Sequence, residues 1–313
     1  MEKPRLVAIV GPTAAGKSSL ALALARQFSG EIISADSVQV YRGLDIGTAK
    51  PSPADRRIVP HHLIDILNPD QDYSAALFRR QAGEIIRILH KRQKPIFVVG
   101  GTGLYLKALT RGLFRGPAAN PGFRARLNLE ADTKGSPFLH HRLHELDPEA
   151  AAGIHPQDRM RIVRALEVHS QSQRKISEFQ KEHRFQETPY EVFKIGLFFE
   201  REELYNRIET RTEKMMERGW LEEVKTLLDQ GYLPHLKALY SLGYKHIVSS
   251  LSGKISLEEA ARLIKRDTRR YAKRQITWFK ADPEISWFSP DPESRVLIEW
   301  KVASFLKRGR IVL

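Results

Sequence analysis

The sequence contains no cysteine, and this absence excludes several kinds of chemistry at once. A chain without thiols has no disulfide framework, no thiolate metal site and no cysteine nucleophile. Long apolar runs are also missing, because none approaches the roughly 20 residues that a membrane-spanning helix requires. The first residues lead into a strand-like segment without a signal-peptide pattern. We therefore expect a protein of the cytoplasm.

Acidic residues are scarce relative to basic ones. The 51 Lys and Arg residues stand against 37 Asp and Glu, which gives a formal net charge of +14. This excess favours a polyanionic partner such as a nucleic acid. A proteome that is basic in general would give the same excess, so charge alone leaves the partner open. With 313 residues, 42% of them hydrophobic, the chain is long enough for a core domain and a second domain.

A glycine-rich run lies between an apolar, strand-like segment (residues 6–10) and a helical pattern (residues 18–28). It matches the pattern G-x-x-x-x-G-K-[ST] and consists of Gly11, Pro12, Thr13, Ala14, Ala15, Gly16, Lys17 and Ser18. The backbone N–H groups of such a loop surround a phosphate, Lys17 adds a positive charge, and the Ser18 hydroxyl can bind Mg²⁺. A chance match is the alternative, but the flanking strand and helix favour a phosphate-binding loop.

Strands and helices alternate over the first hundred residues. We expect strands at 31–35 and 95–99 and a helix at 74–92, where apolar residues recur with helical spacing. Prolines between residues 51 and 60 predict a loop with short turns there. This alternation predicts an α/β fold, a P-loop NTPase-like core in which helices flank a parallel sheet.

The character of the sequence changes near residue 116. Prolines recur, strands disappear, and Ser136 and Asp147 each precede a proline, as helix N-caps do. A longer basic helical stretch follows at about 160–183, and a strand-like segment at 192–199 suggests a return to the sheet. These features predict an all-helical domain inserted into the core.

We therefore divide the chain into three segments: the first part of the core (1–116), the helical insertion (117–190), and the completion of the core with C-terminal helices (191–313). In the last segment we expect helices at 201–218 and 220–230 and a third that opens at Ser256 with a capping box. The third helix carries a basic stripe, which is either a solvated face or a nucleic-acid contact. The stripe consists of Lys265, Arg266, Arg269, Arg270, Lys273 and Arg274.

A P-loop ATPase would normally have a second apolar strand that ends in a magnesium-binding aspartate. Here the strand expected at 95–99 ends on Gly100-Gly101-Thr102-Gly103, and Asp65 follows only a very short segment. This pattern counts against simple ATP hydrolysis and favours chemistry in which the phosphate chain is a leaving group. The glycines let the Thr102 hydroxyl approach a ligand closely, or they mark a plain strand-to-helix turn.

Asp36 closes the expected second strand, so it should lie at the carboxyl edge of the sheet, where ligands bind in open α/β folds. A carboxylate there can hold Mg²⁺ or accept a proton from an acceptor nucleophile. The alternative is an N-cap for the segment that follows. Several hydrogen-bonding side chains come directly after it: Ser37, Gln39, Tyr41 and Arg42.

These motifs resemble those of bacterial tRNA dimethylallyltransferases, in the same order over nearly the whole chain. The resemblance lies in residues 11–18, 33–42, 45–50, 61–65, 100–105, 164–168, 242–244 and 272–278. It implies transfer of a dimethylallyl group from its diphosphate to N6 of the adenosine 3′ of the anticodon, position 37, in tRNAs that read codons beginning with U. The phosphate loop then holds the donor's diphosphate with Mg²⁺, although its motif usually indicates ATP.

The resemblance also implies roles for individual residues. Asp36 matches the general base on the N6 amine, Thr102 a residue at the reacting centre that also contacts tRNA, and Arg211 an arginine that holds the diphosphate. Positions that match tRNA contacts are Asp36, Ser37, Val38, Gln39, Arg124, Gln157, Asp158, Arg159, Met160 and Arg161. Met160 stands where the family more often has glutamine. We expect a monomer without a membrane partner.

Three other functions remain open at this stage. An adenylate dimethylallyltransferase would share the donor site but use a free nucleotide, and the helical insertion and the charge of +14 favour tRNA instead. A small-molecule P-loop kinase would place ATP in the loop and use Asp36 to activate a hydroxyl. A non-enzymatic RNA-binding protein would not need the intact loop at Lys17.

Overall fold

The computed structural model describes residues 2–307, and the chain divides into two compact units. Residues 111–187 form one unit, and the segments on either side of them form the other. The smaller unit corresponds to the insertion expected at 117–190 from the sequence. No helix within residues 2–307 combines the length and the apolar character needed to cross a membrane.

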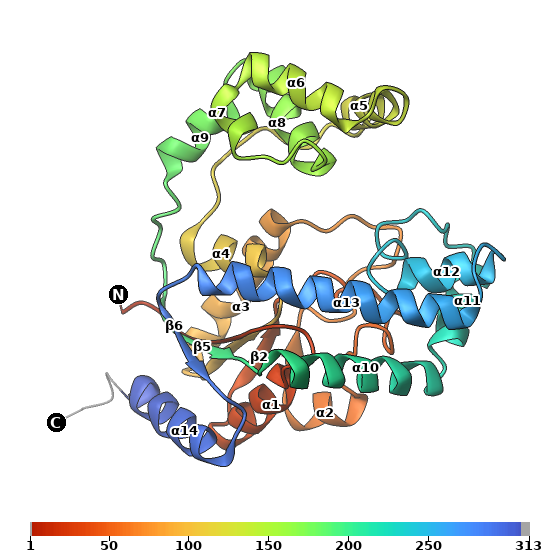
Figure 1. The fold of residues 1–313 in the computed structure, drawn as a ribbon. Helices are drawn as coiled ribbons and strands as arrows, with labels where there is room; N and C mark the ends of the chain where they lie inside the picture. Colours follow the sequence, from red (N-terminus) through yellow and green to blue (C-terminus); the bar gives the residue numbers. More distant parts are fainter. Residues whose placement is uncertain (1, 308–313) are drawn as a thin grey trace. The chain divides into compact units, whose positions relative to one another are not determined.

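The larger unit contains a six-stranded parallel sheet with the order β3-β2-β4-β1-β5-β6 (Figure 1). Its strands are β1 (Arg5–Val10), β2 (Glu31–Ser34), β3 (His61–His62), β4 (Ile96–Val99), β5 (Glu191–Leu197) and β6 (Ile285–Phe288). The predicted parallel sheet is confirmed, including the return of the chain at β5, which pairs with β1. The two-residue β3 is as short as its sequence indicated, whereas β6 was not predicted.

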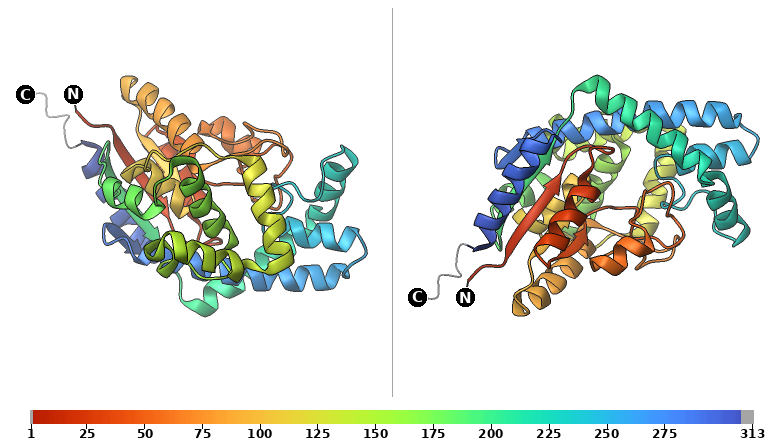
Figure 2. Two further views of the ribbon diagram at one scale, coloured as in Figure 1. Left: turned by 90° about the horizontal axis from the view of Figure 1, so that it is seen from above. Right: turned by 90° about the horizontal axis from the view of Figure 1, so that it is seen from below.

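Helices cover both faces of this sheet, as Figures 1 and 2 show. The helices of this unit are α1 (Lys17–Gln27), α2 (Pro53–Ile58), α3 (Ala75–Lys91), α4 (Gly103–Arg111), α10 (Arg201–Glu217), α11 (Trp220–Asp229), α12 (Tyr244–Leu251), α13 (Leu257–Lys280) and α14 (Pro292–Lys307), of which α11 and α12 pack against α10 and α13. Alternate residues of β1 enter two separate cores: Leu6 and Ala8 pack in one, Val7 and Ile9 in the other. A strand buried on both faces needs the continuous apolar run that this sequence has.

Helix α3 illustrates how the layers form. Its apolar residues Phe78, Ala82, Ile86 and Leu89 follow helical spacing and are all buried in the core beneath it. The Ser74 side chain accepts a hydrogen bond from Leu77 N–H and caps the first turn. Each large side chain buried in this way contributes about 1.5–3 kcal/mol.

The smaller unit contains helices and no strand within residues 111–187. They are α5 (Pro121–Lys134), α6 (Ser136–Leu146), α7 (Pro148–Ala152), α8 (Arg159–Ser172) and α9 (Ile176–His183). Their apolar faces meet in one core around Leu139, Leu143, Ile162 and Leu166. The predicted all-helical character of this segment is confirmed.

Four local expectations need correction. Ser136 is not an N-cap: Gly135 occupies that position and Ser136 lies inside α6, whereas Asp147 does cap α7. Residues 51–60 contain the helix α2, because Ser52 and Asp55 form a capping box there. At Ser256 only half of the predicted box forms, since the Glu259 side chain pairs with Arg262 instead. The basic stretch 160–183 is broken at Gln173, which has a left-handed backbone conformation.

Candidate active site at the carboxyl edge of the sheet

Three neighbouring strands end at the same edge of the sheet and carry the residues singled out from the sequence. The phosphate loop follows β1, Asp36 follows β2, and the glycine turn follows β4, which lies between them. The backbones approach closely, because a Cβ atom on Gly100 would lie 2.1 Å from the Ala35 carbonyl oxygen. The sheet order thus brings together segments that lie far apart in the sequence.

The phosphate loop has the conformation that its glycines predict. Gly11 and Gly16 have φ angles of +136° and +81°, and a Cβ atom on Gly11 would lie 2.6 Å from the Leu197 carbonyl oxygen. Gly16 has no side chain that could occupy the first turn of α1, so the N-terminus of this helix faces the loop. Such an N-terminus is suited to an anion. Lys17 Nζ donates a hydrogen bond of 2.7 Å to the Pro12 carbonyl oxygen.

Two cations and one carboxylate share this partly buried region. Burial, followed by the nearby Arg211 charge, lowers the pKa of Lys17 to about 7, while Asp36 acts in the opposite direction. Burial also lowers the pKa of Arg211, against the influence of Asp36. Cations whose charged forms are destabilised in this way gain from an anion that binds between them.

The Asp36 carboxylate is held in a fixed orientation. Its Oδ1 accepts hydrogen bonds from the backbone N–H groups of Val38 (2.8 Å) and Gln39 (3.2 Å). Within residues 2–307, Oδ2 accepts no hydrogen bond. Asp36 therefore caps the following turn through one oxygen and leaves the other available to a ligand, so the two alternatives weighed for it are compatible.

Two cavities meet at Asp36. The larger, of about 1020 Å³, extends from the phosphate loop along α10, and the smaller, of about 280 Å³, lies towards α11 and α12. Seven residues line both: Thr13, Ala14, Asp36, Thr48, Arg211, Met215 and Tyr271. Ligands in the two cavities would therefore approach each other beside the Asp36 carboxylate.

The glycine turn after β4 accommodates side chains of α13. A Cβ atom on Gly101 would lie 2.1 Å from Gln275 Nε2, and one on Gly103 would lie 2.1 Å from Trp278 Nε1. Gln275 Nε2 donates to the Gly101 carbonyl oxygen (3.0 Å), and its Oε1 accepts from Thr13 N–H in the phosphate loop (2.9 Å). This amide therefore fastens two of the site's three loops to each other.

Thr102 does not line either cavity. The Tyr271 side chain lines both cavities, and the side chains of Thr102 and Gln275 lie near its phenol oxygen. Burial and the nearby Asp36 charge raise the pKa of Tyr271 to about 12, so the phenol stays protonated. Sequence reasoning missed Tyr271 and Gln275, although their spacing of four residues places both on one face of α13.

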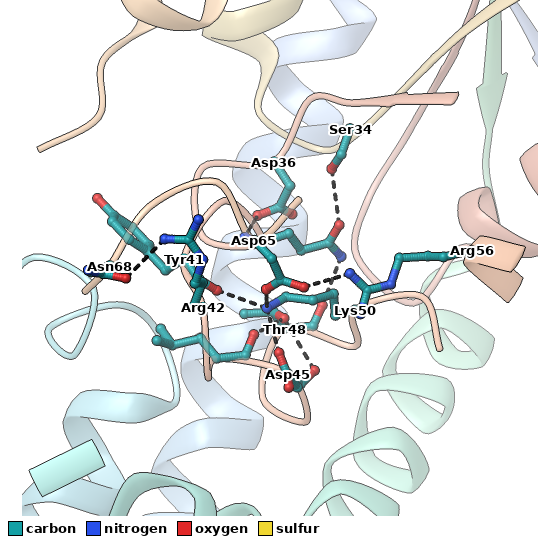
Figure 3. A network of polar contacts seen from close by, with 12 residues as sticks. Ser34, Asp36, Tyr41, Arg42, Asp45, Thr48, Lys50, Arg56, Asp65 and Asn68 are labelled. Carbon is teal, nitrogen blue, oxygen red and sulfur yellow. Dashed lines mark hydrogen bonds and ion pairs between the residues drawn. The ribbon is translucent and has the colours of Figure 1, made fainter. Parts of the chain in front are cut away.

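The loop after Asp36 is braced by a network of polar contacts (Figure 3). Lys50 Nζ lies 2.5 Å from carboxylate oxygens of both Asp45 and Asp65, and Arg56 pairs with Asp65 at 2.6 Å. Gln39 is buried, and its amide bonds the Ser34 hydroxyl and the Thr48 carbonyl. Asp65 is thus engaged in ion pairs, and Gln39 is occupied within the fold.

In the smaller unit, Arg124 forms a bidentate pair with the fully buried Glu167, with distances of 2.8 and 2.7 Å. Asp158 caps α8 by accepting from Arg161 N–H, and Arg159 pairs with Asp132. Met160 projects into solvent with 82% of its surface exposed, next to the two arginines. The segment 157–161 thus presents two arginines, each paired with an aspartate, around an exposed thioether.

Family models and known proteins are similar to this chain over most of its length. The model of the family described as "IPP transferase" matches residues 39–282, and that described as "Isopentenyl transferase" matches residues 4–59. The chain is 55% identical to tRNA dimethylallyltransferase 2 of Geotalea uraniireducens (90% of this chain, 91% of the relative). It is 52% identical to the tRNA dimethylallyltransferase of Geobacter sulfurreducens over 90% of both chains.

Two solved structures are similar over most of the chain. A tRNA isopentenylpyrophosphate transferase from Bacillus halodurans has a TM-score of 0.73 and 40% identity, with 98% of both chains covered. A eukaryotic dimethylallyltransferase, described as acting on tRNA, has a TM-score of 0.79 and 27% identity, with 96% of this chain and 77% of that chain covered.

Proposed function

This chain belongs to the tRNA dimethylallyltransferase family, and we propose that it transfers a dimethylallyl group from dimethylallyl diphosphate to N6 of adenosine 37 in tRNAs that read codons beginning with U. The chain is accordingly an enzyme, a prenyl transferase. The observation that carries the proposal in detail is the pair of cavities that meet at Asp36. One leads to a phosphate loop, and the other leaves room for an acceptor base.

The phosphate loop holds the diphosphate of the donor. Its backbone N–H groups, Lys17 and Arg211 surround the negative charge that grows as the C1–O bond of the donor breaks. Since the allylic cation is comparatively stable, most of the catalytic effect comes from stabilising the departing diphosphate.

A magnesium ion fits this site. The Ser18 hydroxyl lines the larger cavity next to Lys17, and an oxygen donor of this kind suits Mg²⁺, which usually takes its other ligands from phosphate oxygens and water. When bound, the ion neutralises part of the charge on the leaving diphosphate. Ser18 is the residue of this chain that would hold it.

Asp36 acts as the general base. An aromatic exocyclic amine is a weak nucleophile, so a carboxylate that takes its proton assists the attack. The bond from N6 to C1 of the dimethylallyl group forms as the C1–O bond breaks, and the N6 proton passes to Asp36 Oδ2. The hydrogen bonds to Oδ1 keep the carboxylate pointing at the junction of the two cavities.

The acceptor adenosine reaches this junction through the smaller cavity. It must leave its stack in the anticodon loop to do so, which costs a few kcal/mol that contacts with the rest of the tRNA can offset. Ser37, Val38 and Tyr271 line this cavity. Contacts outside the cavity come from Arg124 and segment 157–161. We propose that the protein works as a monomer in the cytoplasm.

The test is a transfer assay with labelled dimethylallyl diphosphate, in which unmodified tRNA and AMP are offered in parallel. We expect label in tRNA at adenosine 37. The variant Asp36→Asn should lose about 10²- to 10⁴-fold in rate while it still binds tRNA. Asp229→Asn, an exposed aspartate on α11, is the matched control and should retain wild-type activity.

Transfer to AMP without transfer to tRNA would identify an adenylate dimethylallyltransferase instead. Consumption of ATP with a phosphorylated product would identify a kinase.

A further inference from the structure

Helix α10 has two charged faces that differ in how their charges are neutralised. On one face, Glu213 pairs with Lys265 of α13 at 2.6 Å, and Glu209 pairs with Arg269 of the same helix. Four of the six residues in the basic stripe predicted on α13 are engaged in ion pairs within the fold: Lys265, Arg266, Arg269 and Arg270. The two pairs with α10 join the two helices and leave less free charge on that side.

The other face carries a row of cations directed at the larger cavity. Arg207, Arg211, Lys214 and Arg218 follow one another at helical spacing, and all four line that cavity. Arg211 is the inner member beside Asp36. Arg207 is fixed, because its Nε donates to the Ala14 carbonyl oxygen (3.0 Å) and its guanidinium lies over the Phe199 ring.

Lys214 and Arg218 continue the row outwards from the phosphate loop. Both are exposed, and no carboxylate within residues 2–307 lies within 4.0 Å of their charged groups. Arg26 of α1 also lines the cavity and has no such partner either. These three cations therefore lie around the outer part of the cavity without a partner to neutralise them.

The acidic residues that line the cavity neutralise little of the positive charge of these three cations. Asp36 lies at the inner end, and Asp55 is occupied in capping α2 through Ser52. Glu203, in the first turn of α10, is the remaining carboxylate in the lining. A concave surface lined mainly by one sign of charge concentrates the electrostatic field and attracts oppositely charged ligands.

We propose that Lys214, Arg218 and Arg26 form an outer cationic groove that attracts the diphosphate of the allylic donor and passes it inwards to Lys17 and Arg211. This proposal rests on the proposed function. A small, highly charged anion suits the groove because the groove is concave and leads directly to the phosphate loop. The volume of about 1020 Å³ also extends well beyond the loop itself.

The experiment compares the wild type with the double variant Lys214→Gln/Arg218→Gln. Association rate and Kd are measured with dimethylallyl diphosphate and Mg²⁺ in the absence of tRNA, so that no transfer occurs. The control is Lys225→Gln, an exposed lysine on α11 that lies outside the cavity. Each protein is measured at about 10 mM and at about 1 M salt, where the Debye length falls from roughly 30 to 3 Å.

At low salt we expect the double variant to associate with the donor about 5- to 10-fold more slowly than the wild type, within the range of electrostatic steering. At high salt the difference should fall below about 2-fold, because screening removes long-range attraction. The control should match the wild type, and the Kd for tRNA should be unchanged in all variants.

An equally slow association in Lys225→Gln would contradict the proposal that the groove attracts the donor. So would a difference between the double variant and the wild type that persists at high salt. A weaker Kd for tRNA with unaltered donor binding would assign the row to tRNA phosphates instead. Failure of the proposed function is distinguishable, because the wild-type protein would then fail to transfer the dimethylallyl group to tRNA, whatever its affinity for the donor.

Discussion

Lys17 in the α/β unit and Glu167 in the helical unit are both charges withdrawn from water, but their surroundings differ. Burial, followed by the nearby Arg211 charge, lowers the pKa of Lys17 to about 7, and Asp36 opposes this only in part. Burial alone would raise the pKa of Glu167, but hydrogen bonds from Arg124, the Asn120 N–H and Arg164 lower it to about 2. Lys17 forms no ion pair within residues 2–307, whereas Glu167 has several hydrogen-bonding partners.

The different surroundings of Lys17 and Glu167 distinguish a ligand-binding site from a structural ion pair. A buried charge whose hydrogen bonds are complete within the protein, such as Glu167, stabilises the surrounding helices. A pair of like charges that weaken each other, such as Lys17 and Arg211, costs stability until an anion binds. Five substitutions or conditions test this comparison, in order of decreasing expected effect.

The largest effect is expected from Lys17→Met. Loss of the cation nearest the leaving diphosphate should lower kcat/KM for dimethylallyl diphosphate by about 10²- to 10³-fold. The melting temperature should not fall, because a destabilised charge has been removed from the folded state. Steady-state kinetics and thermal denaturation measure the two quantities. A clear loss of stability would show that Lys17 is a structural cation like those around Glu167.

Glu167→Ala should instead lower the stability of the protein. It leaves Arg124 and Arg164 without their shared carboxylate, and we expect a loss of about 2–4 kcal/mol in the free energy of unfolding, moderated because both arginines reach solvent. Urea denaturation measures the loss. Glu145→Ala, which removes an exposed pair with His141, is the control and should cost less than about 1 kcal/mol.

The ion pairs of Glu167 also predict that the free energy of unfolding falls in acid. Because the folded-state pKa of Glu167 is depressed, its contribution to stability is complete above about pH 4.5 and is lost as the pH falls towards 2. The free energy of unfolding should therefore change less between pH 5 and pH 3 in Glu167→Ala than in the wild type. An unchanged pH dependence in the variant would contradict this assignment.

Donor affinity should depend on pH through Lys17. Its folded-state pKa is lowered to about 7, so the free protein loses this proton above pH 7, and diphosphate binding must restore it. The Kd for dimethylallyl diphosphate should therefore rise by up to about tenfold per pH unit above 7. Lys17→Arg keeps its charge and should flatten the profile. Calorimetric titration between pH 6 and 9 measures this dependence; an equally steep profile in Lys17→Arg would assign it to another group.

The smallest effect is expected from Gln275→Ala, which frees the phosphate loop from the glycine turn without removing a charge. Two hydrogen bonds are lost, each worth about 0.5–1.5 kcal/mol, so KM for the donor should rise about 5- to 10-fold with a smaller change in kcat. Thr277→Ala, on an exposed turn of the same helix, is the control. Equal losses in KM and kcat, or none, would mean that Gln275 does not position the loop.

Sequence patterns predicted the parts of the site that depend on local geometry. The phosphate loop follows from a strand, glycines at positions of positive φ and a helix, all within about 20 residues. The place of Asp36 follows from its position directly after a strand. Helix α2 and strand β6 were missed, since a short capped helix among prolines and a short edge strand give weak periodic signals.

The sequence by itself determined that this chain has an α/β core with a phosphate loop, an inserted helical unit and an acidic group at the edge of the sheet. Tertiary structure decided how these parts act on each other. Gln275 reaches Thr13 across 262 residues and Gly101 across 174, and the cations of α10 face the phosphate loop only because β5 pairs with β1. Contacts of this range depend on how the layers pack, and no local pattern encodes them.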